Sequence, residues 1–67
     1  MARTNLKLFR VAKNMSQAEF AKKIGYVRTT VADIEKGKRE GRKTFWNALQ
    51  REFSLDDETV QALQKND

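Results

Sequence analysis

The sequence contains no cysteine, no histidine and no proline, and the first two absences exclude whole classes of chemistry. Without cysteine there is no disulfide framework and no thiol nucleophile. Without cysteine and histidine the usual zinc ligands are missing. Imidazole acid–base catalysis is excluded as well. No nucleophile–base pair and no phosphate-binding glycine loop is present either. We therefore expect no enzyme, no metal site, no cofactor and no small-molecule ligand.

Long apolar runs are also absent. The longest are only a few residues, too short to span a membrane, and the N-terminus lacks the apolar stretch of a signal peptide. A chain of 67 residues suits one domain near the lower limit for a self-sufficient core. We expect a cytoplasmic protein with a single domain over residues 1–67, frayed over the last few residues at each end.

Positive charge is plentiful and unevenly distributed. Residues 1–51 hold 13 of the 14 basic side chains and only four of the nine acidic ones, whereas residues 52–67 hold one basic and five acidic side chains. A basic domain suits a polyanion, and nucleic acid is the commonest polyanion in the cytosol. A charged surface that merely keeps the protein soluble is the alternative.

Helical spacing of apolar residues recurs along the chain, with little strict alternation, and predicts an all-α bundle of five short helices. Ser16 and Glu19 form a capping box, and Gly25 and Gly37 suit left-handed ends of helices. Thr4 or Asn5, Thr44 and Asp56 are further N-cap candidates. Three predicted helices cover about residues 5–13, 16–24 and 27 or 28 to 36, and two more begin at about residues 44 and 56.

The same spacing predicts which side chains face inward. Residues on one helical face recur three, four or seven positions apart. Leu8 and Val11 fall off the inner face of the first helix and should be exposed. The expected inner residues are Leu6, Phe9, Phe20, Ala21, Ile24, Val27, Val31, Ile34, Trp46, Leu49, Phe53, Val60 and Leu63.

The second and third predicted helices are joined by a short turn containing Gly25, which is the pattern of a helix-turn-helix. In that motif the second helix enters the major groove of DNA, where arginine can bind guanine and a threonine methyl can contact thymine. An ordinary surface helix of mixed polarity is the alternative for this pattern taken alone. The outer face of this third helix carries Arg28, Thr29, Thr30, Asp33 and Lys36.

Two stretches of the chain are distinctive: "SQAEFAKKIG", residues 16–25, and "VADIEKGKR", residues 31–39. They resemble the XRE helix-turn-helix family, which comprises the small DNA-binding domains of phage Cro and repressor proteins and their bacterial relatives. The resemblance extends from Leu6 to about Val60. It implies a lambda-repressor-like fold in which residues 28–36 form the recognition helix in the major groove.

The resemblance also implies roles for individual residues. Arg28, Thr29, Thr30 and Asp33 match positions that read bases. Arg10 and Glu35 match a partly buried salt bridge and so have a structural role. The expected phosphate-binding residues are Gln17, Tyr26, Lys36, Lys38, Arg39, Arg42 and Lys43.

Some positions depart from the family pattern. Val27 stands where relatives often have a capping Ser or Thr, and Gly41 stands where they often have Pro. Lys43 replaces an apolar residue, with Phe45 available to fill that space, and Ser54 replaces a helix-ending Gly.

These observations predict a sequence-specific regulator of transcription that binds double-stranded DNA. We expect a stand-alone protein, Cro-like or a small repressor, from a bacterium or phage. The alternative is the N-terminal domain of a longer repressor. We expect a homodimer on a pseudo-palindromic operator, which forms either before DNA binding or only on the DNA. The acidic C-terminal segment around Val60 and Leu63 is its expected dimer surface. The alternative is a protein-interaction module, such as an antitoxin or anti-regulator, that uses Leu8 and Val11.

Overall fold

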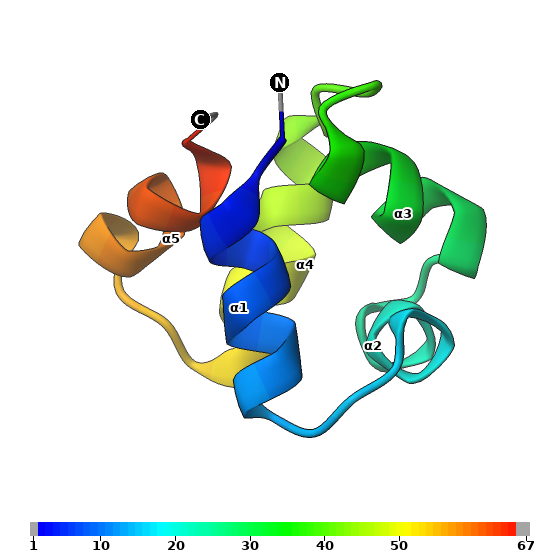
Figure 1. Ribbon diagram of the computed structural model, residues 1–67. Coiled ribbons are helices and arrows are strands. Elements are labelled where there is room, and N and C mark those ends of the chain that lie inside the picture. The colour runs from blue at the N-terminus through cyan, green and yellow to red at the C-terminus, as the bar shows by residue number, and fades with distance from the viewer. Residues whose placement is uncertain (1, 66–67) are drawn as a thin grey trace.

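The computed structural model describes residues 2–65, which form five helices and no strand. The helices are α1 (Thr4–Ala12), α2 (Gln17–Ile24), α3 (Arg28–Lys36), α4 (Lys43–Phe53) and α5 (Asp57–Gln64), shown in Figure 1. The predicted all-α bundle of five helices is confirmed. Within this part of the chain no helix is both long and apolar enough to cross a bilayer.

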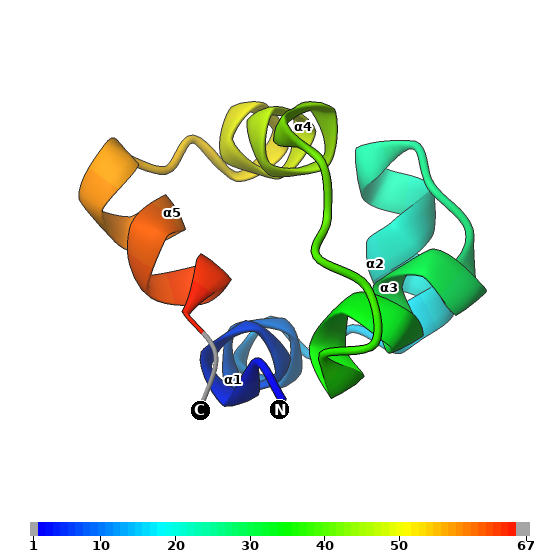
Figure 2. The ribbon, with the colours of Figure 1, turned by 90° about the horizontal axis from the view of Figure 1, so that it is seen from above.

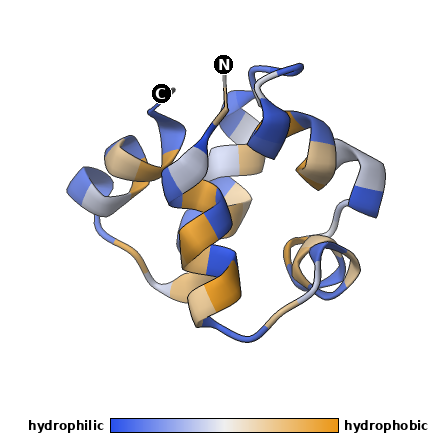
Figure 3. Ribbon diagram, viewed as in Figure 1, coloured by the Kyte–Doolittle hydropathy of each residue, from blue (hydrophilic) through white to orange (hydrophobic). Residues whose placement is uncertain are grey.

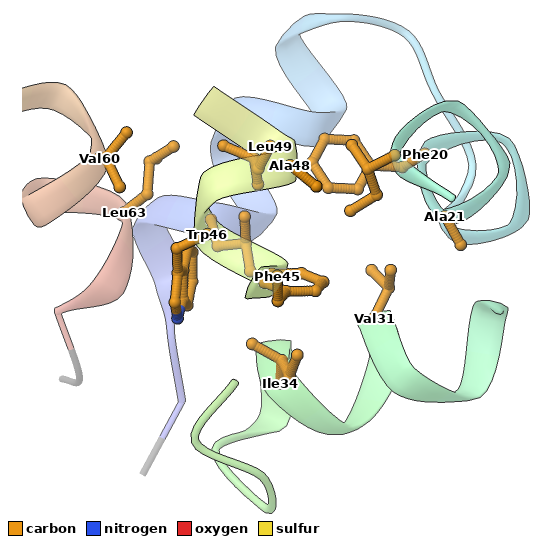
Figure 4. Packing of buried hydrophobic residues seen from close by; sticks show 12 residues of the cluster. Phe20, Ala21, Val31, Ile34, Phe45, Trp46, Ala48, Leu49, Val60 and Leu63 are labelled. Carbon is orange, nitrogen blue, oxygen red and sulfur yellow. The ribbon is translucent and has the colours of Figure 1, made fainter. Parts of the chain in front are cut away.

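The helices surround one core. Helix α1 packs against α3 and α5, while α4 packs against α2 and α5, so that α1 and α4 lie on opposite sides in Figure 2. Apolar segments are spread over all five helices (Figure 3). The largest side chains with almost no exposed surface are Leu6, Phe20, Val31, Ile34, Phe45 and Leu49, and Figure 4 labels all of these except Leu6.

Local capping signals account for several helix ends. The Ser16 hydroxyl accepts a hydrogen bond from the Glu19 amide at 3.1 Å, and the Glu19 carboxylate accepts one from the Ser16 amide at 2.8 Å. The bonds with Ser16, first from its backbone, lower the pKa of Glu19. Asp56 caps α5 by accepting a bond from the Thr59 amide at 2.8 Å, and the hydrogen bonds from Thr59 lower the pKa of Asp56. The capping box and the Asp56 cap are confirmed.

Two predicted caps are wrong. Helix α1 begins at Thr4 with Arg3 as its N-cap residue, and no side chain caps it. Helix α4 begins at Lys43 with Arg42 as its N-cap residue, so Thr44 already lies within the helix. At the start of α4 the Arg42 carbonyl accepts bonds from the Phe45 and Trp46 amides. Lys43 and Thr44 in this first turn are exposed residues, and at such an end water can replace a side-chain cap.

Val27 was expected in the core, but 65% of its surface is exposed. It precedes α3 and has an extended backbone, with φ −103° and ψ 156°. Val27 is therefore not on the inner helical face that Val31 and Ile34 share, because that face begins only with α3. Its place as an uncapped N-cap residue agrees with its departure from the family pattern.

Val60 and Leu63 point into the core from α5, as the helical spacing predicts (Figure 4), and both are buried. Both side chains therefore belong to the core of one copy of the chain, and a dimer surface on this segment would use its exposed residues. Leu8 and Val11 are exposed as predicted, by 59% and 51%. The predicted fraying at residues 1, 66 and 67 lies outside the described residues, but it does not hold at Arg3, which is buried.

Gly41 has a positive φ of 77°, which explains why proline is absent from this position. Proline fixes φ near −65° and could not adopt this backbone. Ser54, which replaces the helix-ending glycine of the family pattern, is likewise left-handed, with φ 54°.

Substitution of Gly41 by alanine should destabilise the fold more than substitution of Gly25. An added Cβ at Gly41 would lie 2.9 Å from Trp46 Nε1 and 3.3 Å from Ile34 Cδ1, whereas one at Gly25 meets nothing within 4 Å. Both glycines have a left-handed backbone. Gly25→Ala should therefore lower the free energy of unfolding only by the cost of placing alanine in that conformation, about 1–2 kcal/mol. Urea unfolding of the two variants measures the difference, and equal costs would contradict the proposed clash with Trp46.

Candidate nucleic-acid interface

Helices α2 and α3 are joined by a tight three-residue turn. Gly25 is left-handed, with φ 83°, and ends α2. The Tyr26 amide donates a hydrogen bond to the Ala21 carbonyl at 2.8 Å, which closes the end of the helix. Across the turn, the buried residues Ile24 and Val31 hold the two helices together in the core. This arrangement is a helix-turn-helix.

The opposite face of α3 is open to solvent. Arg28, Thr29 and Lys36 are exposed, and Thr30 and Asp33 are half-buried. Since the other face of α3 is fixed in the core, these side chains project from a rigid helix. All four predicted base-reading residues and Lys36 therefore reach solvent at least in part, with Arg28 in the first turn of α3 and Lys36 in the last.

The loop after α3 and the start of α4 border the same surface. A hollow between them is lined by Tyr26 and Thr30 from the helix-turn-helix and by Arg39 and Arg42 from the loop. The Tyr26 hydroxyl lies 3.4 Å from Thr44 Oγ1, within hydrogen-bonding distance. Among the predicted phosphate-binding residues, Lys38, Arg39, Arg42 and Lys43 are exposed and Tyr26 is half-buried.

Asp33 and Arg39 also come together on this surface. Arg39 Nη2 lies 3.8 Å from Asp33 Oδ2, and both side chains are partly open to solvent. The Lys38 and Arg39 amides both donate to the Asp33 carbonyl, at 2.9 and 3.3 Å. The loop therefore folds back beside the last turn of α3 and places Arg39 next to Asp33.

Comparison with known proteins agrees with this geometry. A family model described as Helix-turn-helix matches residues 6–41, which is more than half of the chain. The chain belongs to the helix-turn-helix family, of the XRE type. The match ends before α4 and so covers less than the resemblance that extends to Val60. No curated protein and no solved structure matches the chain.

Members of this helix-turn-helix family are DNA-binding regulators, and the chain is therefore a DNA-binding helix-turn-helix regulator. The family is typically non-enzymatic. Among the described residues, no group of three or more acidic side chains is arranged to hold a metal ion.

A buried ion pair ties the helix-turn-helix to α1. Arg10 Nε donates to Glu35 Oε2 at 2.7 Å, and Arg10 Nη2 lies 3.3 Å from Glu35 Oε1. The remaining guanidinium nitrogen, Nη1, donates to the Met15 carbonyl at 2.8 Å. Both charged side chains are nearly inaccessible to water. The pair therefore joins α1 to the last turn of α3.

Gln17 belongs to the same network. Its Nε2 donates to Glu35 Oε1 at 3.1 Å, which links the start of α2 to the end of α3. The amide group of glutamine has two N–H donors. One can therefore stay on Glu35 while the other is free to bind a phosphate oxygen, because Gln17 is only half-buried.

Arg3 is the residue that the sequence reasoning missed. It was expected in a frayed terminus, yet its side chain is 3% exposed and bonded to the end of α3 and to the loop that follows. A signal was present, because Arg3, Leu6 and Arg10 are spaced i, i+3, i+7 and all are buried on one side of α1.

Proposed function

We propose that this regulator recognises specific sequences in double-stranded DNA with α3 in the major groove and acts as a Cro-like protein or small repressor of transcription. The observation that supports this most directly is the outer face of α3, where Arg28 and Thr29 are exposed on a helix whose other face is fixed in the core. An arginine donates two hydrogen bonds to guanine, and a threonine methyl can contact thymine.

The surrounding cations support the same orientation. Arg39 and Arg42 line the hollow beside Thr30 of α3, whereas Lys43 lines hollows that α5 also borders. We expect these three residues and the exposed Lys38 to bind phosphates, while Gln17 and Tyr26 would bind the backbone from the turn. Two copies would occupy the half-sites of a pseudo-palindromic operator about 10 bp apart and associate on the DNA. We place the protein in the cytoplasm of a bacterium or phage-infected cell, as one domain over residues 1–67.

Selection from a random pool of DNA duplexes, at near-physiological salt, tests this function. Enrichment of paired half-sites about one helical turn apart is the expected result. A single unpaired motif would contradict dimeric binding but retain sequence recognition. Absence of any enriched motif would contradict sequence-specific recognition and leave only non-specific attraction between basic residues and DNA.

Arg42→Ala should weaken binding to all duplexes by a similar factor. Because each phosphate neutralised contributes about 0.9 to the slope of log K against log salt, the slope should fall by about one unit for each bound copy. Arg51→Ala is the matched control, since Arg51 lies near the other end of α4 and is 72% exposed. Titrations at several salt concentrations measure both variants. Equal slopes for the two would contradict a phosphate contact by Arg42.

A second candidate function rests on the exposed Leu8 and Val11 of α1. They would serve a protein-interaction module such as an antitoxin or anti-regulator. Replacing both with serine should leave DNA affinity unchanged if the chain acts mainly through DNA, whereas loss of a regulatory effect with intact DNA affinity would favour this second function.

A further inference from the structure

Arg3 has an unusual place for a charged side chain near the start of a chain. Its guanidinium is buried, and its five N–H groups have five acceptors. Nε donates to the Gln64 carbonyl and Nη1 to the carbonyls of Ile34 and Arg39, each at 3.0 Å. Nη2 donates to the Glu40 carbonyl at 3.0 Å and to Glu40 Oε2 at 3.1 Å. The buried charge is therefore fully satisfied.

These acceptors come from three parts of the fold. Ile34 is in the last turn of α3, whose Glu35 carbonyl also accepts the Arg3 amide at 2.8 Å. Arg39 and Glu40 are in the loop between α3 and α4, and Gln64 ends α5. One guanidinium thus binds carbonyls at the end of the predicted recognition helix and in the loop beside it, which fixes the path of the loop relative to α3.

The loop is held from the inside. The carbonyls of Arg39 and Glu40 point to Arg3, while the side chains of Lys38, Arg39 and Arg42 are exposed on the outside. A flexible loop would place these mutually repelling cations over many positions, and fixing them in one position lowers the entropy lost on binding a phosphate.

Trp46 completes the support below the loop. The Arg3 guanidinium lies 5.6 Å from the centre of its ring, and Gly41 packs closely against the indole nitrogen. Figure 4 shows this side chain directed from α4 toward the N-terminal segment. Because Trp46 is the single tryptophan of the sequence, its fluorescence reports directly on the position of the loop.

We propose that Arg3 is a positioning residue for DNA binding, which holds the loop from Lys38 to Arg42 against the end of α3 so that its cations meet phosphates. Arg3 itself is buried and contacts no DNA. This inference rests on the phosphate contacts of the proposed function, and it assigns to the N-terminal segment a part in binding.

Arg3→Lys is the test, because lysine keeps the positive charge but has three donors on one nitrogen and cannot reproduce the five bonds. We expect a smaller salt slope, by about one unit for each loop cation that no longer neutralises a phosphate. Raising the salt from 50 to 200 mM lowers the affinity of both proteins. For each unit by which the slope is smaller, the variant loses about fourfold less affinity over this range than the wild-type chain does. The ratio of affinities for preferred and altered duplexes should stay unchanged, and Trp46 emission should shift to longer wavelength.

Asn5→Ala is the matched control. Asn5 Nδ2 donates to the Ala62 carbonyl at 3.2 Å, so this residue also joins the N-terminal segment to α5, but it has no bond to the loop. Its loss should lower stability and leave the salt slope and Trp46 emission unchanged. Any variant that is partly unfolded in buffer is measured in sucrose, which favours the folded state, with the wild-type chain in the same solution.

The outcomes separate the two proposals. A normal slope in Arg3→Lys, with affinity reduced only by the unfolded fraction, would overturn the positioning role and leave Arg3 as a stabilising residue. Failure of the wild-type chain to select any duplex sequence would overturn sequence recognition instead. The salt slope on an arbitrary duplex would still test Arg3 in that case, because phosphate contacts do not depend on sequence.

Discussion

Arg10→Met should lower the free energy of unfolding by about 3–5 kcal/mol, the cost of leaving a buried charge without its partner. The Glu35 carboxylate would lose two bonds from Arg10, at 2.7 and 3.3 Å, and the Met15 carbonyl would lose its 2.8 Å bond. Small domains have only about 5–15 kcal/mol of stability in total. Urea unfolding followed by circular dichroism should therefore show a variant close to its unfolding transition in water.

The double variant Arg10→Met/Glu35→Leu separates charge burial from packing. It removes both charges and should recover most of the stability that Arg10→Met loses. With both residues replaced by apolar side chains, no buried charge remains without a partner. Arg39→Ala is the control. Its ion pair with Asp33 is long, at 3.8 Å, and partly solvated, so the change should stay within about 0.5 kcal/mol. A similarly small effect of Arg10→Met would show that the buried pair does not hold α1 on α3.

Features set by neighbouring residues could be predicted from the sequence. The capping box of Ser16 and Glu19 and the left-handed glycines Gly25 and Gly37 each depend on a few adjacent positions. The turn between α2 and α3 follows from them, and with it the outer face of α3. The exposure of Arg28 and Thr29 was therefore predictable before any tertiary contact was known.

Features set by distant segments could not be predicted in the same way. The spacing of Arg3 with Leu6 and Arg10 indicates only which side of α1 it lies on. It does not show that carbonyls of α3, the following loop and α5 converge on its guanidinium. Thr44 fits the pattern of an N-cap residue, but α4 begins one residue earlier, at Lys43, after a loop whose path depends on distant contacts. The apolar residues Val60 and Leu63 are compatible both with a core position and with a place in a dimer surface. Only the packing of α5 shows that they are core residues.

The sequence also left open whether the basic residues act together. Lys38, Arg39 and Arg42 follow α3 in the chain, but their position beside its outer face depends on the Asp33 carbonyl and on Arg3. In the proposed function these two regions have different roles. There the side chains of α3 meet bases and the loop meets the DNA backbone, so substitutions in the two should have different effects.

Arg28→Ala should cost about 1–3 kcal/mol on the preferred operator, which is roughly a 5- to 150-fold loss of affinity, and little on a duplex altered at the base pair that Arg28 contacts. The reason is geometric, because an exposed arginine at the start of α3 can donate two bonds to one guanine while alanine donates none. Competition binding with duplexes substituted one base pair at a time measures this loss of discrimination.

Lys36→Ala provides the comparison within the same helix. Lys36 lies in the last turn of α3 and is exposed, like Arg28 in the first turn, but the proposed role is a phosphate contact. Its loss should weaken binding to every duplex equally and flatten the salt dependence, whereas Arg28→Ala should alter sequence preference at one position. If both variants weakened all duplexes alike, Arg28 would contact phosphate, and the N-terminal end of α3 would not read bases.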